Sequence, residues 1–519
     1  MSTLQGQQVL VLGLGESGLA MARWCARSGA GVTVWDSRET PPMGEALKAC
    51  LPDVKVLSGV LREAQLDGVQ RVLKSPGLAP HDERIAPLLA GARTRGVAVQ
   101  GELDLFVEAM AALKAERGYA PRLLAITGTN GKTTTTALTA LLVERAGHGV
   151  AAAGNIGPTL LDTLRQALDA AASTGEQAQP LPEVWVLELS SFQLEGVAGF
   201  EPDAAAVLNL TQDHLDWHGT MQAYGAAKAR VFGRHATMVV NRDDALVLAM
   251  VPVPPTADTA RKARAAKFVP RRVLQFGVGA PQQPGDFGLV EQGGMAWLAR
   301  ALPLDEGPKP RKGEAAEWHL QLLMPADALR IRGRHNAANA LAALALASAI
   351  GMPLAPMLHA LREYRGEPHR VAPLAIVAGI EAFDDSKGTN VGATVAALEG
   401  LGQERQPGKL VVILGGDGKG QDFHPLAAPV ARYARAVALI GRDAAAIEGV
   451  LAGQCVPMQG HSSLEAATAW CFAQALPGDA VLLSPACASL DMFRNYNHRA
   501  EVFARSVHQL AAEHGEVAV

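Results

Sequence analysis

Short apolar runs rich in β-branched residues alternate along the chain with longer stretches of helical periodicity. Near-continuous apolar runs are typical of strands that are buried on both faces of a parallel sheet. Their alternation with helices indicates an α/β fold. The expected strands are residues 9–12, 32–35, 71–74, 123–126, 184–189, 204–208, 238–241, 410–414, 437–440 and 480–483.

Three glycines that directly follow expected strands, Gly13, Gly128 and Gly415, restart this pattern. A chain of 519 residues has room for three domains of ~100–200 residues each. We therefore predict three α/β domains, at residues 1–101, 102–366 and 367–519. Residues 168–182 and 251–317 are interpreted as variable surface loops, apart from one strand at 273–276, because loops tolerate changes in length.

The second of these glycines opens a phosphate-binding loop between a strand and a helix. Glycines let backbone N–H groups wrap a phosphate, and the helix N-terminus adds partial positive charge. Lys132 is placed to reach the β- and γ-phosphates, and the Thr133 hydroxyl to bind Mg²⁺. The usual pattern has another glycine six residues before the lysine, where this chain has Ile126. The loop comprises Gly128, Thr129, Asn130, Gly131, Lys132, Thr133 and Thr134.

Polar residues follow the next expected strands of the middle region. Glu188 ends one strand, where a carboxylate suits a Mg²⁺ beside the phosphates. His214 follows an acidic residue at the exit of another strand and is a candidate for metal binding or proton transfer. Tyr224 and Lys228 lie one helical turn apart, a spacing shared with short-chain dehydrogenases.

The N-terminal glycines match G-x-G-x-x-G after a strand, and Asp36 follows the second strand. This is the fingerprint of a Rossmann-like dinucleotide site. A helix N-terminus recognises phosphate rather than nicotinamide, however, so a UDP-type ligand fits equally well. A second phosphate-binding turn is expected at Ser75, Pro76 and Gly77. The residues alone leave the two ligands open.

Charge and cysteine content narrow the function classes. The formal net charge of -4 gives no indication of a basic surface that would bind nucleic acid. The five cysteines are far apart and form no C-x-x-C pair, which favours reduced thiols in the cytoplasm over disulfides or a zinc site. The N-terminus has no basic leader, and no apolar run approaches the ~20 residues that span a bilayer. We expect a cytoplasmic protein with no membrane partner.

Taken together and in order, these motifs resemble the Mur ligases. The resemblance rests on G-T-N-G-K-T at 128–133, L-E-L-S-S-F-Q-L at 187–194, D-H-L-D at 213–216, Y-G-A-A-K at 224–228, R-G-R-H-N-A-A-N at 332–339, D-D-S-K-G-T-N at 384–390, G-G-D-G-K at 415–419 and S-P-A-C-A-S-L-D at 484–491. It implies a Rossmann-like N-terminal domain for a UDP precursor, a central P-loop ATPase-type domain, and a Rossmann-like C-terminal domain for the amino acid.

The resemblance also implies a reaction. An ATP-dependent ligase would add D-glutamate to UDP-N-acetylmuramoyl-L-alanine through an acyl phosphate and a tetrahedral intermediate, in the synthesis of peptidoglycan precursors. It implies catalytic roles for Lys132, Glu188, His214 and Lys228. Two Mg²⁺ ions would bind, one at Thr133 and Glu188 and one at His214 and Lys228, with Lys228 carboxylated to a carbamate. We expect a monomer with these small-molecule substrates.

The remaining assignments come from the same resemblance, residue by residue. The ATP-binding residues would be the seven loop residues with Asn336, Asn339, Arg370, Asp385 and Lys387. The precursor would contact Gly15, Glu16, Ser17, Asp36, Ser37, Arg38, Ser75, Pro76, Gly77 and Asn155. D-Glutamate would contact Thr389, Lys419, Ser489 and Tyr496. Tyr496 and Ala500 depart from the expected Phe and Gly, which concerns fine specificity rather than the reaction.

Three alternatives stay open. The first is a sister Mur-type or folylpolyglutamate-type ligase with another amino-acid acceptor. The second is a nicotinamide-dependent dehydrogenase that uses the N-terminal glycines with Tyr224 and Lys228, although this leaves Lys132, Glu188 and Lys419 unexplained. The third is a nucleotide-gated binding protein, because a loop that binds ATP need not use it.

Overall fold

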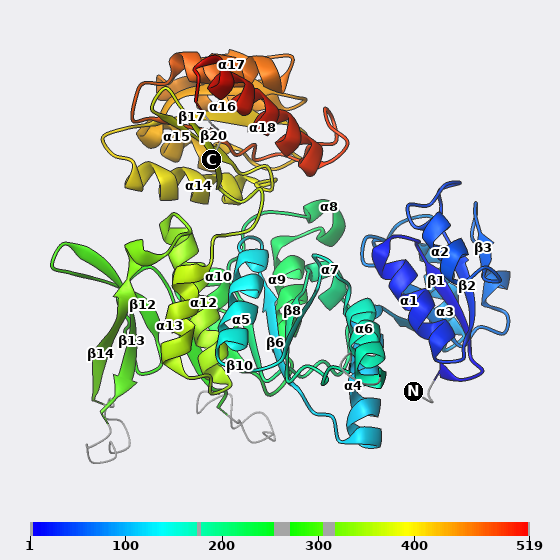
Figure 1. The fold of residues 1–519 in the computed structure, drawn as a ribbon. Helices are drawn as coiled ribbons and strands as arrows, with labels where there is room; N and C mark the ends of the chain where they lie inside the picture. Colours follow the sequence, from blue (N-terminus) through cyan, green and yellow to red (C-terminus); the bar gives the residue numbers. More distant parts are fainter. Residues whose placement is uncertain (1–3, 174–177, 254–269, 305–316, 517–519) are drawn as a thin grey trace, which may run out of the picture.

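The computed structural model describes residues 4–173, 178–253, 270–304 and 317–516. Three sheets of five, nine and six strands follow one another along the chain, each flanked by helices. Figure 1 shows the N-terminal part beside the central part and the C-terminal part above it. This arrangement confirms the predicted three-domain α/β fold. The exact boundaries at 101 and 366 remain predictions.

The N-terminal sheet has the strand order β3-β2-β1-β4-β5, and all its pairs are parallel. Because β1 and β4 are neighbours, the loops that follow them meet at one edge of the sheet. The elements are β1 (Gln8–Leu12), α1 (Glu16–Arg27), β2 (Gly31–Trp35), α2 (Gly44–Cys50), β3 (Lys55–Leu57), η2 (Glu63–Leu66), β4 (Arg71–Lys74), α3 (Ala86–Thr94) and β5 (Ala98–Gln100).

Helix α4 (Glu102–Arg117) leads into the central sheet, whose order is β14-β13-β12-β11-β10-β9-β6-β8-β7. Strand β6 lies between β8 and β9, so the loops after these three strands meet at one point. The strands are β6 (Arg122–Thr127), β7 (Val150–Gly154), β8 (Val184–Glu188), β9 (Ala204–Val207), β10 (Thr237–Asn241), β11 (Val273–Phe276), β12 (Phe287–Gln292), β13 (Met295–Pro303) and β14 (Trp318–Pro325).

The helices of the central part cover both faces of this sheet (Figure 1). They are α5 (Lys132–Arg145), α6 (Leu160–Ala172), α7 (Ser191–Leu194), α8 (Leu215–His218), α9 (Met221–Ala229), η4 (Arg230–Phe232), α10 (Ala245–Leu248), η5 (Ala326–Ala328), α12 (Arg334–Ala349) and α13 (Leu354–Glu363). No helix in the described part of the chain is both long and apolar enough to cross a membrane.

The C-terminal sheet has the order β15-β16-β20-β17-β18-β19, with only the β15–β16 pair antiparallel. Its strands are β15 (Ala372–Val377), β16 (Ile380–Asp384), β17 (Leu410–Gly415), β18 (Ala434–Ile440), β19 (Met458–Gly460) and β20 (Ala480–Leu483). Its helices are α14 (Val391–Glu404), η6 (His424–Leu426), α15 (Ala427–Tyr433), α16 (Ala444–Leu451), η7 (Ala452–Gln454), α17 (Leu464–Gln474) and α18 (Tyr496–Glu513).

All the expected strands are present, and only β18 begins as much as three residues early. The interpretation of 251–317 as surface loop is wrong for its described parts, which include β12 and β13. These strands form a hairpin in which Gln292 pairs with Met295 across Gly293 and Gly294, both at positive φ. A Gly-Gly pair between two short runs is a hairpin signal in the sequence. Residues 168–172 likewise belong to α6 and not to a loop.

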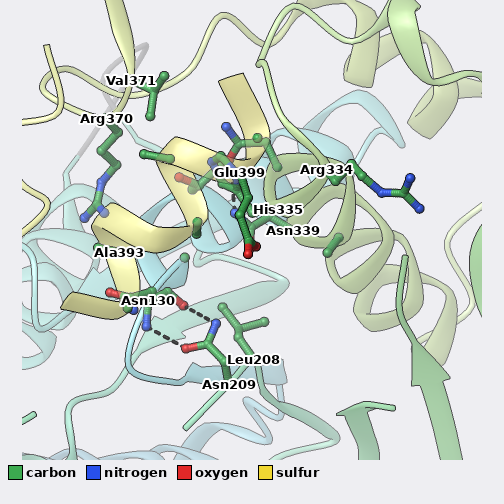
Figure 2. A pocket seen from close by; sticks show the side chains of 18 of the residues that line it. Asn130, Leu208, Asn209, Arg334, His335, Asn339, Arg370, Val371, Ala393 and Glu399 are labelled. Atoms are coloured by element: carbon green, nitrogen blue, oxygen red, sulfur yellow. Dashed lines mark hydrogen bonds between the residues drawn. The ribbon is translucent and has the colours of Figure 1, made fainter. Parts of the chain in front are cut away.

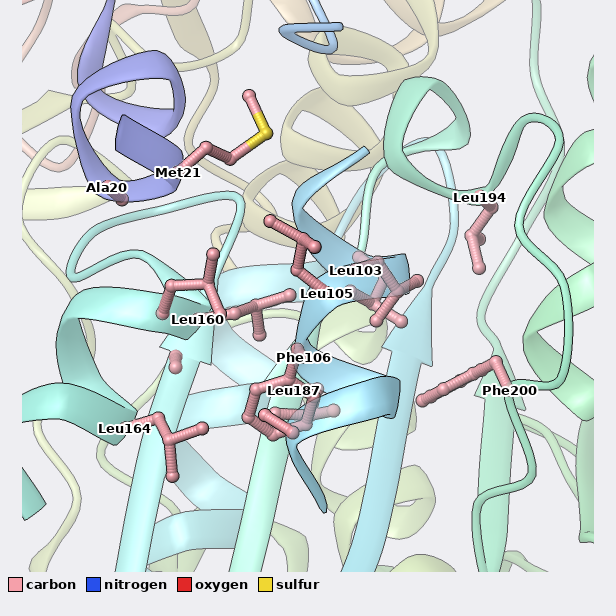
Figure 3. Packing of buried hydrophobic residues seen from close by; sticks show 14 of the residues in the cluster. Ala20, Met21, Leu103, Leu105, Phe106, Leu160, Leu164, Leu187, Leu194 and Phe200 are labelled. Atoms are coloured by element: carbon pink, nitrogen blue, oxygen red, sulfur yellow. The ribbon is translucent and has the colours of Figure 1, made fainter. Parts of the chain in front are cut away.

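One hydrophobic cluster runs from the N-terminal part through α4 into the central sheet. Figure 3 shows Leu103 and Phe106 of α4 pointing toward Leu160 and Leu187. The Phe106 ring also meets the Trp185 ring edge to face at 5.2 Å. Helix α4 therefore joins two domains through buried apolar surface.

Two ion pairs reinforce this junction between α1 and α6. Arg23 Nη1 lies 3.3 Å from Asp162 Oδ2, and Arg27 Nη1 lies 2.6 Å from Asp169 Oδ1. The two large apolar clusters of the C-terminal part contain, among the described residues, only residues from 371 onward. The first two domains thus share a core, whereas the third has its own.

We expect Phe106→Ala to lower the free energy of unfolding by about 3–5 kcal/mol, because a buried ring is replaced by a cavity. Urea unfolding measures the change. Val60→Ala is the matched control, since this side chain is 83% exposed. Equal losses in the two variants would show that α4 does not carry the shared core.

Candidate active site

The phosphate loop runs from the end of β6 to the start of α5. Gly131 has φ 81°, in the left-handed region that favours glycine. A Cβ at this position would collide with Asn339 Oδ1 of α12, so the loop and this helix are closely fitted. Lys132 Nζ folds back and donates to the carbonyl oxygens of Gly128 at 2.9 Å and Thr129 at 2.7 Å.

A second lysine reaches the same carbonyl from helix α9. Lys228 Nζ donates to Gly128 O at 2.8 Å and lies 4.6 Å from the centre of the Tyr224 ring. Lys228 is only 2% exposed. Burial lowers its pKa well below the ordinary value, and the neighbouring Lys132 charge lowers it further. Both effects disfavour the charged ammonium form of Lys228.

Glu188 lies at the end of β8, as predicted, and is 2% exposed. Asn155 Nδ2 donates to Glu188 Oε1 at 3.1 Å. Among the described residues Glu188 forms no ion pair within 4.0 Å, although its charge acts on both Lys132 and Lys228. A buried carboxylate without a contacting cation is a fitting ligand for Mg²⁺.

His214 begins α8 with φ 54°, a left-handed conformation that is uncommon for a non-glycine residue. Its ring meets the Phe192 ring edge to face at 4.7 Å. Burial lowers the pKa of His214. This favours the neutral imidazole, the form that binds metals.

Phe192 belongs to an aromatic cluster whose role the sequence did not reveal. The other members are Trp217, His218 and Tyr224, with neighbouring rings 4.4–5.7 Å apart. Burial lowers the pKa of His218 to about 4, and its Nε2 lies 2.9 Å from Ser191 Oγ. The cluster fixes His214 on one side and Tyr224, beside Lys228, on the other.

No group of three or more His, Cys, Asp or Glu side chains is placed to hold a metal in residues 4–516 as far as they are described. The predicted sites use only one such residue each, together with Thr133 or a modified Lys228. The two Mg²⁺ sites thus remain predictions.

A cavity of about 490 Å³ opens beside the loop, between α12 and α14 (Figure 2). Asn130 and Asn209 bridge its floor through two hydrogen bonds of 2.8 and 3.1 Å. It collects eight of the predicted ATP residues: Asn130, Gly131, Thr134, Asn336, Asn339, Arg370, Asp385 and Lys387. The sequence reasoning missed other lining residues, among them Asn209, Arg334, His335, Ala393, Ala396 and Gly400.

Arg370 connects the third domain to the phosphate loop. Its Nη2 donates to Thr133 Oγ1 at 2.5 Å. The flanking residues His369 and Val371 both have positive φ, at 63° and 51°. Such strain persists only where the surrounding structure enforces it. The strained backbone on either side of Arg370 therefore directs its side chain toward the phosphate loop.

Asp385 lies in the same cavity and accepts a hydrogen bond from Ser484 Oγ at 2.6 Å. Burial raises the pKa of Asp385 to about 7, because the charged form loses its hydration. Lys387, also in the cavity, places its Nζ 3.9 Å from the centre of the Tyr496 ring. Burial, together with the nearby Arg370 charge, lowers the pKa of Lys387 to about 8.

Three of the predicted D-glutamate residues come from loops at the carboxyl ends of β16, β17 and β20, which are adjacent strands, and the fourth, Tyr496, begins α18. Lys419 Nζ reaches across to the central domain and lies 3.4 Å from Asp213 Oδ1. Asn390 makes a similar bridge to Asn130 at 3.0 Å. Thr389 and Ser489 lie in the loops after β16 and β20, and Ser489 is buried.

A second cavity of about 490 Å³ lies at the edge of the N-terminal sheet. Asp36 closes its floor, since its carboxylate accepts hydrogen bonds from Leu14 N at 2.7 Å and from Arg38. Burial opposes ionisation, but these bonds outweigh it and hold the pKa of Asp36 at about 2. Nine of the ten predicted precursor residues line this cavity: Gly15, Glu16, Ser17, Asp36, Ser37, Arg38, Ser75, Pro76 and Gly77.

The tenth, Asn155, lies beside Glu188 and not in this cavity. Arg84 lines the cavity but was missed, and its Nη1 donates to Ser37 Oγ at 3.0 Å. Tyr224 Oη lies 3.1 Å from Thr129 Oγ1. The pair Tyr224 and Lys228 therefore belongs to the phosphate loop, which removes the support for a dehydrogenase that uses it with the N-terminal glycines.

Three family models match the chain in succession. They are a Mur ligase MurD-like N-terminal domain at residues 7–101, a Mur ligase middle domain at 126–269 and a Mur ligase glutamate ligase domain at 369–487. The chain belongs to the Mur ligase family, and the predicted resemblance is confirmed.

Within the family, the chain is similar over its whole length to UDP-N-acetylmuramoylalanine--D-glutamate ligases. It is 60% identical to that of Albidiferax ferrireducens over 99% of this chain and 98% of the relative. It is 57% identical to that of Burkholderia pseudomallei over 98% of each.

Solved structures share the fold at low identity. The UDP-N-acetylmuramate-alanine ligase of Thermotoga maritima has a TM-score of 0.53 at 19% identity and covers 97% of this chain and 99% of its own. The MurF ligase of the same organism, solved with ADP, has a TM-score of 0.53 at 16% identity, covering 98% and 96%.

We expect Gly131→Ala to weaken nucleotide binding by at least about tenfold, because the new methyl group collides with Asn339. Titration with ADP measures the affinity. Gly147→Ala, at the other end of the same helix, is the control: it also has positive φ, at 92°, but nothing lies within 4 Å of the added carbon. Equal ADP affinities in the two variants would show that the loop does not bind the nucleotide.

Proposed function

We propose that the chain joins D-glutamate to UDP-N-acetylmuramoyl-L-alanine by an amide bond, at the expense of ATP, in the synthesis of peptidoglycan precursors. The observation that carries the proposal is the meeting of the phosphate loop, the half-buried Lys132, the buried Lys228 and Glu188 at one point of the central sheet. Similarity to D-glutamate-adding ligases over nearly the full length supports the choice of substrates.

The reaction has two steps. The precursor carboxylate attacks the γ-phosphorus of ATP, which releases ADP and leaves an acyl phosphate. The neutral amine of D-glutamate then adds to the acyl carbon, and the tetrahedral intermediate expels phosphate, while the amine proton passes to solvent. Positioning and charge neutralisation supply most of the acceleration in such transfers.

ATP is assigned to the cavity between α12 and α14, with its phosphates on the loop. Lys132 and the N-terminus of α5 bind the phosphates, and Arg370 holds Thr133 from the other domain. Asn336 and Asn339 lie on the purine side, where Asn339 Nδ2 donates to Asn336 Oδ1 at 3.1 Å. Asp385 and Lys387 complete this cavity from the third domain.

Mg²⁺ would be held by Thr133 and Glu188 at one position and by His214 and Lys228 at the other. The buried Glu188 carboxylate, which has no cation in direct contact, and the His214 imidazole, whose pKa is lowered by burial, fit this role. When bound, the metal neutralises phosphate charge.

Lys228 is assigned a carbamate. The neutral amine attacks the carbon of carbon dioxide: a C–N bond forms, one C=O π bond opens to leave a negative oxygen, and one N–H proton passes to solvent. The product would place a negative charge beside Lys132, where the two groups attract each other. A carbamate oxygen is also a metal ligand, which an ammonium group cannot be.

The N-terminal cavity is assigned to the UDP end of the precursor, with its diphosphate at Gly15 to Ser17, where α1 begins. Asn155, beside Glu188, would contact the far end of the precursor, near the metals. On the amino-acid side, Lys419 supplies a cation for a dianionic substrate, with Thr389, Ser489 and Tyr496 around it.

A cytoplasmic location, a monomeric state and the absence of nucleic-acid and membrane partners belong to the same proposal. The use of ATP and the five free cysteines support the location.

The direct test supplies ATP, Mg²⁺, UDP-N-acetylmuramoyl-L-alanine and D-glutamate and follows phosphate release. We expect release to require both co-substrates and to stop when EDTA removes the metal. Phosphate release that ignores D-glutamate, or that proceeds equally with another amino acid, would contradict the proposal.

We expect Lys228→Ala to abolish turnover, with no recovery on addition of bicarbonate, because the acceptor amine is gone. Lys228→Arg keeps a cation but cannot form the carbamate, and it is expected to be equally inactive. Lys114→Ala, at an exposed position of α4, is the control and is expected to keep full activity. Activity in either Lys228 variant would reject the carbamate.

A further inference from the structure

The His335 imidazole is held between two glycines of different domains. A Cβ on Gly333, just before α12, would lie 2.7 Å from His335 Cε1. A Cβ on Gly400 of α14 would lie 2.8 Å from His335 Nδ1. A Cβ on Gly400 would also lie 3.1 Å from the Gly333 Cα, so the two backbones themselves approach closely. The ring and this backbone contact therefore act together as the spacer between the first turn of α12 and the middle of α14.

The surroundings of the His335 ring favour its neutral form. Burial lowers the pKa of His335 to about 4, although the Ala396 backbone raises it. Nδ1 is buried without a hydrogen-bond partner in the described part of the chain. A second bond joins the same two helices, since Gly333 N donates to Glu404 Oε1 at 2.6 Å. Two contacts thus fix the approach of α14 to α12.

This approach sets the width of the nucleotide cavity. Both helices line it, and Figure 2 shows His335 and Asn339 facing the segment that carries Ala393 and Glu399. The lining positions 393, 396, 397 and 400 of α14 are alanines and a glycine. Their spacing of three and four puts them on one side of a helix. These small residues offer a planar purine a flat wall, and the longer lining side chains of Glu399 and Gln403 lie beside them on α14.

We propose that His335 is a positioning residue that holds this wall at the distance a purine ring needs, and that Gly400 is required as the seat of its imidazole. The inference rests on the proposed function, because it assumes that the purine end of ATP occupies this cavity. It concerns the fit of the nucleotide and not the chemical step.

Gly400→Ala tests whether this position must leave room for the His335 imidazole, because the new methyl group would push against the ring. We expect the dissociation constant for ADP, measured by calorimetry without turnover, to rise about tenfold, which corresponds to about 1.4 kcal/mol. KM for ATP should rise in parallel, and kcat at saturating ATP should stay within about threefold, because the phosphates and metals are not displaced.

His335→Ala removes the spacer and is expected to weaken ADP binding to a similar degree. In the double variant His335→Ala, Gly400→Ala, the methyl group enters vacated space, so the two losses should not multiply. Gly449→Ala is the control: this glycine is also in a helix of the third domain, but nothing lies within 4 Å of an added Cβ. It should bind ADP as the wild type does.

The outcomes separate the two proposals. A wild type that neither binds ADP nor releases phosphate with its co-substrates would overturn the proposed function. If the wild type does both, then unchanged ADP binding in Gly400→Ala, or losses that multiply in the double variant, would overturn the role of His335 alone. Thermal unfolding of each variant shows whether it is folded. If Gly400→Ala does not fold, the ADP affinity of His335→Ala decides.

Discussion

The site depends on two lysines, one buried and one half-buried, that donate to the same carbonyl oxygen. Lys132 and Lys228 come from α5 and α9, and both reach the oxygen of Gly128. Two ammonium groups this close repel each other, and burial removes the water that would screen them. Burial and the other lysine's charge therefore lower the pKa of Lys228, whereas Glu188 and Asp213 act against this shift. In the proposed function, Lys132 binds phosphate and Lys228 reacts with carbon dioxide.

The surrounding structure brings the other residues of the site close to Lys132 and Lys228. The loops after β6, β8 and β9 converge because β6 lies between the other two strands, and this brings Glu188 and His214 to the lysines. An aromatic cluster fixes His214 and Tyr224. The first two domains share an apolar core, whereas the third reaches the site through polar contacts such as Arg370 with Thr133 and Lys419 with Asp213. Contacts of this kind suit a domain that must admit and release substrates.

The sequence predicted much of this, for physical reasons that also mark its limits. Buried parallel strands have a strong local signature, so β1, β4, β6 and β20 were found. The β12–β13 hairpin was not predicted, because its strands are half exposed and lie in a region whose composition is typical of a surface loop. The family resemblance grouped motif residues such as Asn339 and Arg370, and the structure brings them to one cavity. The close contacts of His335 with Gly333 and Gly400 depend on how two domains pack against each other, and no local sequence pattern predicts this packing.

The most direct test of the account is the state of Lys228 in the folded enzyme. Carbon-13 NMR of the protein equilibrated with ¹³C-labelled bicarbonate detects a lysine carbamate without any turnover. The account predicts one carbamate signal per chain in the wild type and none in Lys228→Arg. A wild-type spectrum without that signal, or a signal that persists in the variant, would contradict the central role given to the two lysines.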